Sequence, residues 1–253
     1  MGAAAEMSAL QARDLRKSFG GIAAVAGVSF SLEPGEMLAL IGPNGAGKST
    51  CFNMLNGQLR PDGGQVLLAG RDITGMAPRA ICRLGVGRTF QITATFASMT
   101  VRENIQTALL SHHRRIWRFW ASADAHAIGQ ADALLARVGM AEQADRPAGV
   151  LAYGDLKRLE LAIALANAPR LLLMDEPTAG MAPAERTALM TLTRGIAKAE
   201  GVAVLFTEHD MDVVFGAADR ILVLNRGQLI AEGAPAAVRA NAEVRAVYLG
   251  THA

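Results

Sequence analysis

The sequence predicts an α/β fold in which a mixed sheet is preceded by an antiparallel β-subdomain and interrupted by an inserted helical subdomain. Three observations lead to this prediction. A short apolar run, Met37 to Ile41, leads into a glycine-rich loop and then into a stretch of helical composition. A second apolar run, Leu171 to Met174, ends in two carboxylates. Between these runs, no strand pattern is visible from Ile92 to about Asn167.

The chain has 253 residues, which is enough for one large α/β domain with an inserted subdomain. We predict a single domain over residues 8–250, with the helical subdomain at about 92–167 and a helical tail at about 235–250. Its 51% hydrophobic and 19% charged residues are typical of a globular protein. The 25 basic and 23 acidic residues leave no basic surplus that would indicate a nucleic-acid partner.

The remaining elements follow from periodicity and from turn residues. The segment from Leu10 to Phe30 is rich in Val, Phe and Ala and is divided by Gly20-Gly21, which predicts two strands joined by a turn. Thr100 and Glu103 form a capping box at the start of a helix. Further strands are expected at Gln65–Ala69, Val86–Phe90 and Val202–Phe206, a hairpin at Ile221–Leu224 and Gln228–Ala231, and helices at Pro78–Leu84, Thr100–Leu110, Asp124–Val138, Pro183–Lys198 and Pro235–Leu249.

The glycine-rich loop, GPNGAGKST, matches the phosphate-binding pattern G-x-x-x-x-G-K-[ST] in the strand-to-helix context that the pattern requires. Glycines let the backbone turn tightly and direct N–H groups at an anion, and the following helix directs its positive dipole end there too. Lys48 adds a charge for the outer phosphates, and the Ser49 hydroxyl can ligate Mg²⁺. The predicted phosphate-binding residues are Gly42, Pro43, Asn44, Gly45, Ala46, Gly47, Lys48, Ser49 and Thr50.

Asp175 and Glu176 come directly after the buried run that begins at Leu171. In a parallel sheet the carboxyl ends of the strands face the ligand crevice. Asp175 would then lie beside Ser49 and hold Mg²⁺ through water, whereas Glu176 would orient and polarise the water that attacks the γ-phosphate. The alternative is a pair of solvated acids in a cap or turn, and the phosphate loop upstream argues against it.

Three more residues are candidates for the same crevice. His209 follows the next buried strand, so we predict a contact with the γ-phosphate. Gln91 ends a strand at the entry to the helical insert, where it would report Mg²⁺ or the attacking water to that insert. Phe19 lies at the Gly20-Gly21 turn and either packs in the fold or stacks on a nucleotide base. Lys48, Gln91 and His209 join Glu176 as predicted catalytic residues.

Together these motifs resemble the nucleotide-binding subunit of ABC transporters, and the resemblance covers nearly the whole chain. In that family's terms, Gln91 corresponds to the Q-loop glutamine and Asp175 to the end of the Walker B strand. Glu176 corresponds to the catalytic base, His209 to the switch histidine and Phe19 to the A-loop aromatic residue that stacks on the base. The order and spacing of these motifs are specific to the family.

The resemblance also places a family signature, usually LSGGQ, at the start of the helix Gly154–Ala166. It implies ATP and Mg²⁺ as cofactors and a head-to-tail dimer in which this segment caps the γ-phosphate bound by the partner subunit. The dimer would then close when ATP binds, and hydrolysis of the ATP would reset it. The segment consists of Leu151, Ala152, Tyr153, Gly154 and Asp155.

The sequence departs from the family pattern in the loops that would lie at the dimer interface. The signature has Ala152 in place of serine and Tyr153 and Asp155 in place of glycine and glutamine. Ala182 stands where the D-loop usually has aspartate. Gly154, whose backbone must approach the phosphate, is kept, so we still expect ATPase activity.

The resemblance further implies partners and location. The helical insert would dock a transmembrane permease at the cytoplasmic face of the inner (plasma) membrane, and a solute-binding protein would act indirectly. The second ATPase subunit is either another copy of this chain or a different one. An exporter ATPase, a non-transport ABC ATPase and a small-molecule kinase remain as alternatives, in that order.

Several weaker features resemble the subfamily that imports branched-chain amino acids. They are Arg88-Thr89-Phe90-Gln91, a YGD signature, AGMAP after the base, a C-terminal VYLG and a basic-aromatic stretch after His112. Related subunits serve urea, amides or aromatic acids, so these substrates stay open. The part of that stretch from Trp117 to Trp120 either contacts the permease or membrane surface or packs within the insert.

Overall fold

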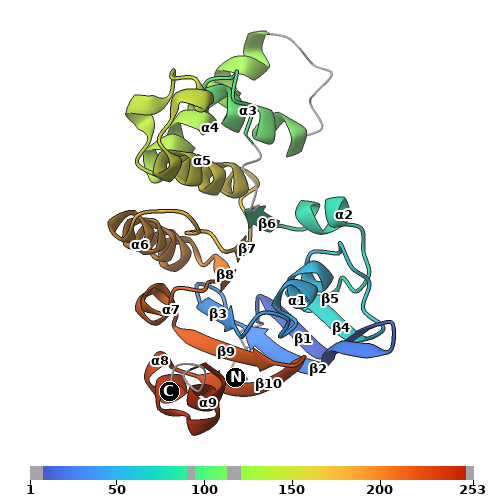
Figure 1. The fold of residues 1–253 in the computed structure, drawn as a ribbon. Helices are drawn as coiled ribbons and strands as arrows, with labels where there is room; N and C mark the ends of the chain where they lie inside the picture. Colours follow the sequence, from blue (N-terminus) through green and yellow to red (C-terminus); the bar gives the residue numbers. More distant parts are fainter. Residues whose placement is uncertain (1–7, 90–94, 113–120, 249–253) are drawn as a thin grey trace, which may run out of the picture.

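A six-stranded mixed sheet forms the centre of the computed structural model, which describes residues 8–89, 95–112 and 121–248 (Figure 1). Neighbouring strands pair in parallel except at one edge, where the last two strands form the predicted hairpin around Arg226-Gly227. The predicted mixed sheet is therefore confirmed. In spatial order the strands are β10 (Gln228–Gly233), β9 (Arg220–Asn225), β3 (Met37–Ile41), β8 (Ala203–Thr207), β7 (Leu171–Asp175) and β6 (Val86–Thr89).

Both faces of this sheet are covered, which explains why its inner strands are continuous apolar runs. All five residues of β3 are buried, and they alternate between two hydrophobic cores. Leu38 and Leu40 belong to one core, whereas Met37, Ala39 and Ile41 belong to the other. This alternation follows from the two-residue period of a strand, and the same division holds along β7, β8 and β9.

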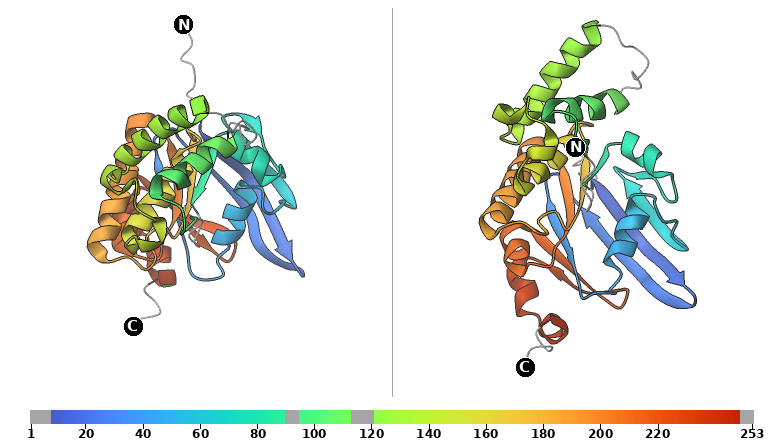
Figure 2. Two further views of the ribbon diagram at one scale, coloured as in Figure 1. Left: turned by 90° about the horizontal axis from the view of Figure 1, so that it is seen from above. Right: turned by 45° about the horizontal axis from the view of Figure 1, so that its top comes forward.

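A four-stranded antiparallel sheet and a short helix cover one of these faces (Figure 2). The turn predicted at Gly20-Gly21 joins its two long strands, and both glycines have positive φ, at 53° and 84°. The two-residue strand of this sheet is too short to leave a sequence pattern. The elements are β1 (Leu10–Phe19), β2 (Ile22–Leu32), β4 (Gly63–Leu68), β5 (Arg71–Asp72) and the helix α1 (Lys48–Leu55).

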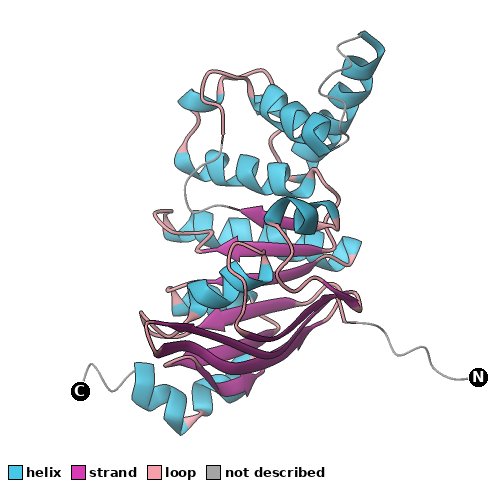
Figure 3. Ribbon diagram, turned by 90° about the vertical axis from the view of Figure 1, so that its right-hand side faces the viewer, coloured by secondary structure: helices cyan, strands magenta, loops and turns pink. Residues whose placement is uncertain are grey.

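Helix α2 (Pro78–Arg83) packs through Ile81 against the core that the antiparallel sheet covers, and the remaining helices lie on the other face and beyond the two ends of the six-stranded sheet (Figure 3). Two of them, after β7 and β8, pack beside the sheet, and three form a group at one end of the molecule. Two short helices close the opposite end. The bounds are α2 (Pro78–Arg83), α3 (Val101–His112), α4 (Ala121–Arg137), α5 (Tyr153–Leu165), α6 (Pro183–Glu200), α7 (Met211–Ala217), α8 (Pro235–Ala240) and α9 (Ala242–Tyr248).

Helices α3, α4 and α5 pack on one another in the region predicted to be the helical subdomain. The capping box at its start is present, since the Thr100 N–H donates to Glu103 Oε2 at 2.7 Å and the Glu103 N–H donates to Thr100 Oγ1 at 3.2 Å. The described residues between 92 and 167 contain no strand, only an isolated bridge between Thr100 and Pro147. The region shares one continuous core with the sheet.

The C-terminal tail differs from the single helical stretch expected. It consists of two helices separated at Asn241, whose backbone is extended with ψ 125°. The Asn241 side chain accepts hydrogen bonds from the N–H groups of Glu243 and Val244 and so caps α9. Within the described residues, no helix is long and apolar enough to cross a membrane.

Candidate functional site

The carboxyl ends of β3, β7 and β8 meet at one edge of the parallel part of the sheet. Strand β3 pairs with β8, and β8 pairs with β7, with Asp175 opposite Thr207. The segments that follow these strands carry the glycine loop, the two acids and His209. Because parallel strands place their carboxyl ends on the same side, residues far apart in sequence come together at this edge.

The glycine loop follows β3 and ends at the first turn of α1. A Cβ at Gly42 would lie 2.3 Å from the carbonyl oxygen of Leu224, and a Cβ at Gly47 would lie 2.3 Å from the carbonyl oxygen of Ala24. Gly47 also has φ 105°, and as the N-cap of α1 it provides no side chain to occupy the helix N–H groups. The two motif glycines are therefore required by close packing, and the start of α1 keeps N–H groups for an anion.

Lys48 is buried at the base of this loop. Its Nζ donates to the carbonyl oxygens of Gly42 at 2.6 Å and Pro43 at 3.1 Å. Burial lowers the pKa of Lys48, and the negative charges of Glu176 and Asp175 act in the opposite direction. The Lys48 ammonium thus lies between the phosphate loop, the two acids and the start of α1. This is the position that an ammonium needs in order to bind a phosphate held by the loop.

Asp175 ends β7 and is half-buried. Its Oδ1 accepts a hydrogen bond from the Thr207 hydroxyl at 2.7 Å, and Arg88 Nη2 lies 3.8 Å from its Oδ2. The Thr207 bond orients the carboxylate, which makes it a suitable oxygen donor for a hard cation. Thr207 and Arg88 were not predicted as site residues, although Thr207 ends β8 and Arg88 lies near the end of β6, the two strands that flank β7.

Glu176 adopts a left-handed backbone, with φ 48°. This conformation costs a non-glycine residue about 1 to 3 kcal/mol. Its N–H is held by the carbonyl oxygen of Thr207 at 3.2 Å and the hydroxyl of the same residue at 3.1 Å. The surrounding bonds therefore stabilise an unfavourable conformation at a predicted catalytic residue.

His209 contacts Glu176 directly. The distance from His209 Nε2 to Glu176 Oε1 is 2.8 Å, and the imidazole is more than half exposed. The two residues come from the ends of neighbouring strands, β7 and β8, so the sheet itself brings them together. The structure thus adds a carboxylate partner to the phosphate contact predicted for His209.

The residues around His209 tie it to the loop after Glu176. Glu208 is buried and accepts hydrogen bonds from the Thr178 N–H at 2.8 Å and from its hydroxyl at 2.7 Å. Asp210 caps α7 and forms a 2.5 Å ion pair with Arg186 Nη1. These contacts were missed in the sequence, because an acid or a threonine outside a motif gives no spacing signal.

Arg186, the partner of Asp210, also contacts the segment that precedes α6. Its Nε donates to the carbonyl oxygen of Met181 at 2.7 Å. Glu185 Oε2 in turn accepts from the N–H of Ala182 at 3.3 Å. Arg186 therefore links the carboxylate of Asp210, the residue after His209, to the loop before α6. This loop contains Ala182, the position at which the family usually has aspartate.

The signature segment lies against the same loop. A Cβ at Gly154 would lie 2.8 Å from Glu185 Oε1, and the Tyr153 ring lies 3.4 Å from the position of a Cβ on Gly180. Ala152 forms the N-cap of α5 with no side-chain oxygen. Because Glu185 Oε1 ends a flexible side chain that can move aside, packing within the chain does not by itself require glycine at 154, and the approach of its backbone to a phosphate stays a prediction. Of the five predicted residues, Leu151 and Gly154 are buried, whereas Ala152 and Tyr153 are exposed and Asp155 lies in the first turn of α5.

The other predicted residues lie apart from this cluster. Phe19 ends β1, the residue is 50% exposed, and Lys17 Nζ is 5.7 Å from the ring centroid. That exposure leaves the ring free for stacking. Gln91 and the stretch from Trp117 to Trp120 lie outside the described residues, so their roles stay predictions.

Comparisons with known proteins agree with this geometry. Residues 25–179 match the ABC transporter family model, and residues 228–253 match the model of the branched-chain amino acid ATP-binding cassette transporter. A curated relative from Escherichia coli (strain K12), the high-affinity branched-chain amino acid transport ATP-binding protein LivG, is 40% identical over 95% of this chain and 97% of its own. The high-affinity branched-chain amino acid transport ATP-binding protein BraF from Pseudomonas aeruginosa is 39% identical over 95% of this chain and 97% of its own.

Solved structures give the same result. A nucleotide-free ATP-binding cassette from an ABC transporter superposes with a TM-score of 0.84 at 32% identity, covering 96% of this chain and 99% of that one. The ADP conformation of MJ1267, also an ATP-binding cassette of an ABC transporter, superposes with a TM-score of 0.85 at 31% identity and with the same coverage. The fold thus follows these structures along almost the entire length of the chain.

Proposed function

Because this chain belongs to the ABC transporter ATP-binding family, we propose that it is the ATP-hydrolysing motor subunit of an importer for branched-chain amino acids. The observation that carries the chemistry is the 2.8 Å contact between Glu176 and His209, at the strand ends beside the phosphate loop. The branched-chain substrate rests on the match of residues 228–253 and on the relatives' descriptions.

In the proposed reaction, the loop Gly42–Thr50 and Lys48 bind the phosphates of ATP. Glu176 orients a water molecule and accepts its proton while the oxygen attacks the γ-phosphorus. The bond between that phosphorus and the bridging oxygen breaks, which gives ADP and phosphate. His209 keeps the Glu176 carboxylate in place, and Phe19 stacks on the adenine base of ATP.

The oxygen donors beside the loop fit Mg²⁺. A serine hydroxyl at Ser49 and a carboxylate at Asp175, oriented by Thr207, are ligands that this ion prefers, and Gln91 is the third predicted ligand. Among the described residues, no group of three or more His, Cys, Asp or Glu is arranged to hold a metal. The other ligands would therefore be water and phosphate oxygens, whose charge the ion neutralises when bound.

The proposed assembly contains a second ATPase subunit, identical or different, placed head to tail. The signature segment Leu151–Asp155 would then complete the partner's site. Transmembrane permease subunits dock on the helical subdomain at about 92–167, which holds the chain at the cytoplasmic face of the inner membrane. A solute-binding protein delivers the amino acid, and nucleic acid has no part in the cycle.

Uptake in cells tests this proposal. We expect a strain that carries Glu176→Gln to lose most uptake of labelled leucine, isoleucine and valine, because an amide cannot accept the water proton. ATP hydrolysis by the purified variant should fall by about 10²- to 10⁴-fold. The matched control is Glu142→Gln, an exposed carboxylate far from the loop in sequence, which should leave both rates unchanged.

The same strains separate the alternatives. Normal branched-chain uptake with defective uptake of urea, an amide or an aromatic acid would reassign the substrate within the importer class. Retention of labelled compounds inside the cells would indicate export. If Glu176→Gln, purified from native membranes with ATP, brought down no permease subunit, the transport proposal itself would be wrong.

A further inference from the structure

Phe19, the residue proposed to stack on the adenine base, stands beside an open turn. It ends β1 and is 50% exposed, and Ile22, its pair on β2, is 75% exposed. Apart from the chain neighbours, no described atom lies within 4 Å of the position of a Cβ on Gly20 or Gly21. The tip of this hairpin is thus unpacked, so the restraint on Phe19 comes from the strand that precedes it.

Asp62 holds this end of β1 through three hydrogen bonds. It lies in the loop between α1 and β4. Its Oδ2 accepts from the Ser18 N–H at 2.8 Å, and its Oδ1 accepts from Lys17 Nζ at 2.6 Å. Its own N–H donates to the carbonyl oxygen of Arg16 at 2.8 Å. Asp62 therefore contacts each of the three residues that precede Phe19.

The Lys17 ammonium connects Asp62 to the aromatic ring. Its Nζ lies over the Phe19 ring, 5.7 Å from the centroid, a distance at which a cation is attracted to the face of the ring. Only 15% of the Lys17 side chain is exposed. The Lys17 bond and the Ser18 N–H hold the pKa of Asp62 below its usual range, so the carboxylate is charged at physiological pH. The ion pair thus fixes the flexible lysine in the rotamer that covers the ring.

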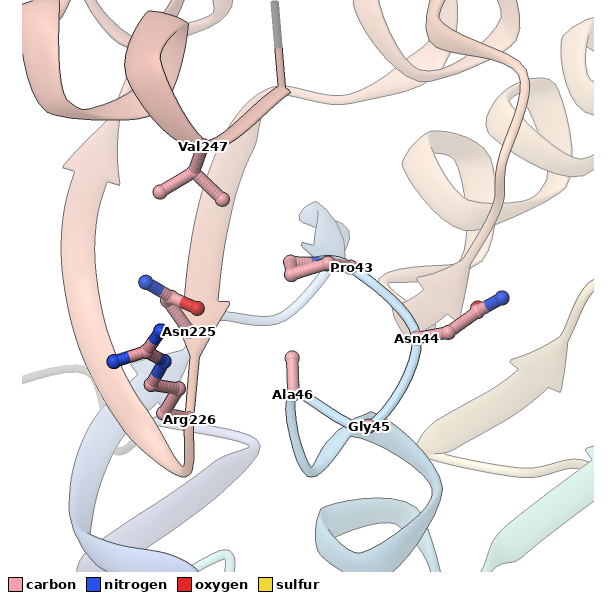
Figure 4. A pocket seen from close by; sticks show the side chains of 7 residues that line it. All are labelled: Pro43, Asn44, Gly45, Ala46, Asn225, Arg226 and Val247. Carbon is pink, nitrogen blue, oxygen red and sulfur yellow. The ribbon is translucent and has the colours of Figure 1, made fainter. Parts of the chain in front are cut away.

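The phosphate end of the site is held by other elements. Figure 4 shows the turn between β9 and β10 across a pocket from residues 43–46 of the phosphate loop, and the pocket has a volume of about 360 Å³. Gly227 of that turn donates its N–H to the carbonyl oxygen of Ala46 at 2.9 Å. The three bonds of Asp62 reach no residue of the phosphate loop, so they act on the base end of the nucleotide site.

We propose that Asp62 is a positioning residue for ATP, which sets the Phe19 ring for the adenine base by holding the end of β1 and the Lys17 ammonium. With Lys17 over one face of the ring, the opposite face stacks on the base. A ring that is placed before the nucleotide arrives loses less conformational freedom on binding, so removing Asp62 weakens the contact with the base. The inference rests on the stacking of Phe19 in the proposed function and adds the residues that hold the ring.

Calorimetric titration of the full chain with two ligands tests this role. In the presence of Mg²⁺, ATP offers both a base and phosphates, whereas inorganic tripolyphosphate offers phosphates alone. For Asp62→Ala we expect the Kd for ATP to rise about two- to fivefold, the range for a weakened polar contact, and the Kd for tripolyphosphate to stay unchanged. Lys17→Met, which keeps the length of the side chain without its charge, should change the two constants in the same way.

A double variant separates positioning from a general effect on the fold. Phe19→Ala alone should raise the Kd for ATP about fivefold or more, the effect of losing one stacked base. Adding Asp62→Ala to Phe19→Ala should cause no further rise, because the ring that Asp62 positions is gone.

The matched control is Asp72→Ala, which should leave both Kd values unchanged. Asp72 is an exposed aspartate on β5 of the same sheet, and its carboxylate also accepts a backbone N–H, from Thr74 at 2.8 Å. Strand β5 is separated from β1 by β4, so the loss of this bond leaves Phe19 untouched.

Three results would overturn the role of Asp62: an unchanged Kd for ATP in Asp62→Ala, an equal rise for tripolyphosphate, or a further rise in the Phe19→Ala background. An unchanged Kd in Phe19→Ala would remove both the stacking and its positioning residue. Failure of the parent chain to bind ATP would instead count against the proposed function.

Discussion

Glu176 and His209 act as a pair at the scale of single residues. The left-handed backbone of Glu176 places its carboxylate 2.8 Å from the imidazole. This contact restricts the rotamers of the side chain and helps to keep the carboxylate where it orients water. His209 therefore has a role in positioning Glu176, the catalytic base, in addition to the phosphate contact that its position at a strand end predicts.

Replacing His209 by alanine should expose this role. We expect kcat to fall by at least about 10²-fold, because the Glu176 carboxylate loses its orienting partner. The KM for ATP should change by less than about threefold, since the loop and Lys48 are untouched. Steady-state ATPase assays measure both constants. A large rise in KM with unchanged kcat would show that His209 serves nucleotide binding instead.

Motif spacing predicted some site residues and missed others for a definite reason. Lys48, Asp175 and Glu176 each follow an apolar run, and a run of that kind marks a strand whose end is exposed to ligand. Arg186 lies inside a helix and has no such mark, and Glu208 follows an apolar run but belongs to no recognised motif. Their importance comes from partners more than 20 residues away, Asp210 and Thr178, which only folding brings near.

At the scale of elements, two helices that face the predicted dimer begin without a capping side chain. Ala152 is the N-cap of α5 and Ala182 is the N-cap of α6, and both stand where the family pattern has serine or aspartate. Glu185 compensates in part, because it accepts the Ala182 N–H. The departures from the family pattern therefore weaken the starts of two helices.

Restoring a cap should stabilise the chain. Ala182→Asp provides an oxygen for the free N–H groups of α6, and we expect a gain of about 1 kcal/mol and a Tm higher by about 2–4 °C. The control, Ala184→Asp, adds the same charge to the first turn at an exposed position where it cannot cap. Thermal unfolding compares the two. Equal shifts would assign the effect to the helix dipole rather than to the cap.

At the scale of the whole molecule, Asp219 joins the sheet to the helical layer. Its Oδ2 accepts from the Met37 N–H at 3.0 Å and from Lys198 at 2.8 Å, and its Oδ1 accepts from Arg194 at 2.7 Å. Burial raises the pKa of Asp219, but these partners together outweigh it and hold the pKa below its usual range. One carboxylate thus connects β3 to α6.

This pKa shift makes the stability depend on acid pH. A carboxyl whose pKa is lower in the folded chain stabilises it fully above the unfolded value of about 4, and the contribution is lost as pH falls through the folded value. We expect Asp219→Asn to lower the free energy of unfolding at pH 7 by about 1 to 2 kcal/mol, discounted for partial exposure. Urea titrations at pH 7 and pH 3 should show a smaller acid loss in this variant.

Asp145→Asn is the matched control, because that carboxylate is 81% exposed and joins no two layers. Its urea curves should follow those of the parent chain at both pH values. If the two variants behaved alike, Asp219 would not connect the layers energetically.

The amino-acid sequence by itself determined the parallel strands, the phosphate loop and the acids at a strand end. These features depend on local periodicity and on residues close together in the chain, such as Gly42 to Thr50 and Leu171 to Glu176. Only the tertiary structure decided which distant groups meet: His209 with Glu176, and Asp219 with Met37. Such contacts are set by strand order and layer packing, which no local pattern encodes.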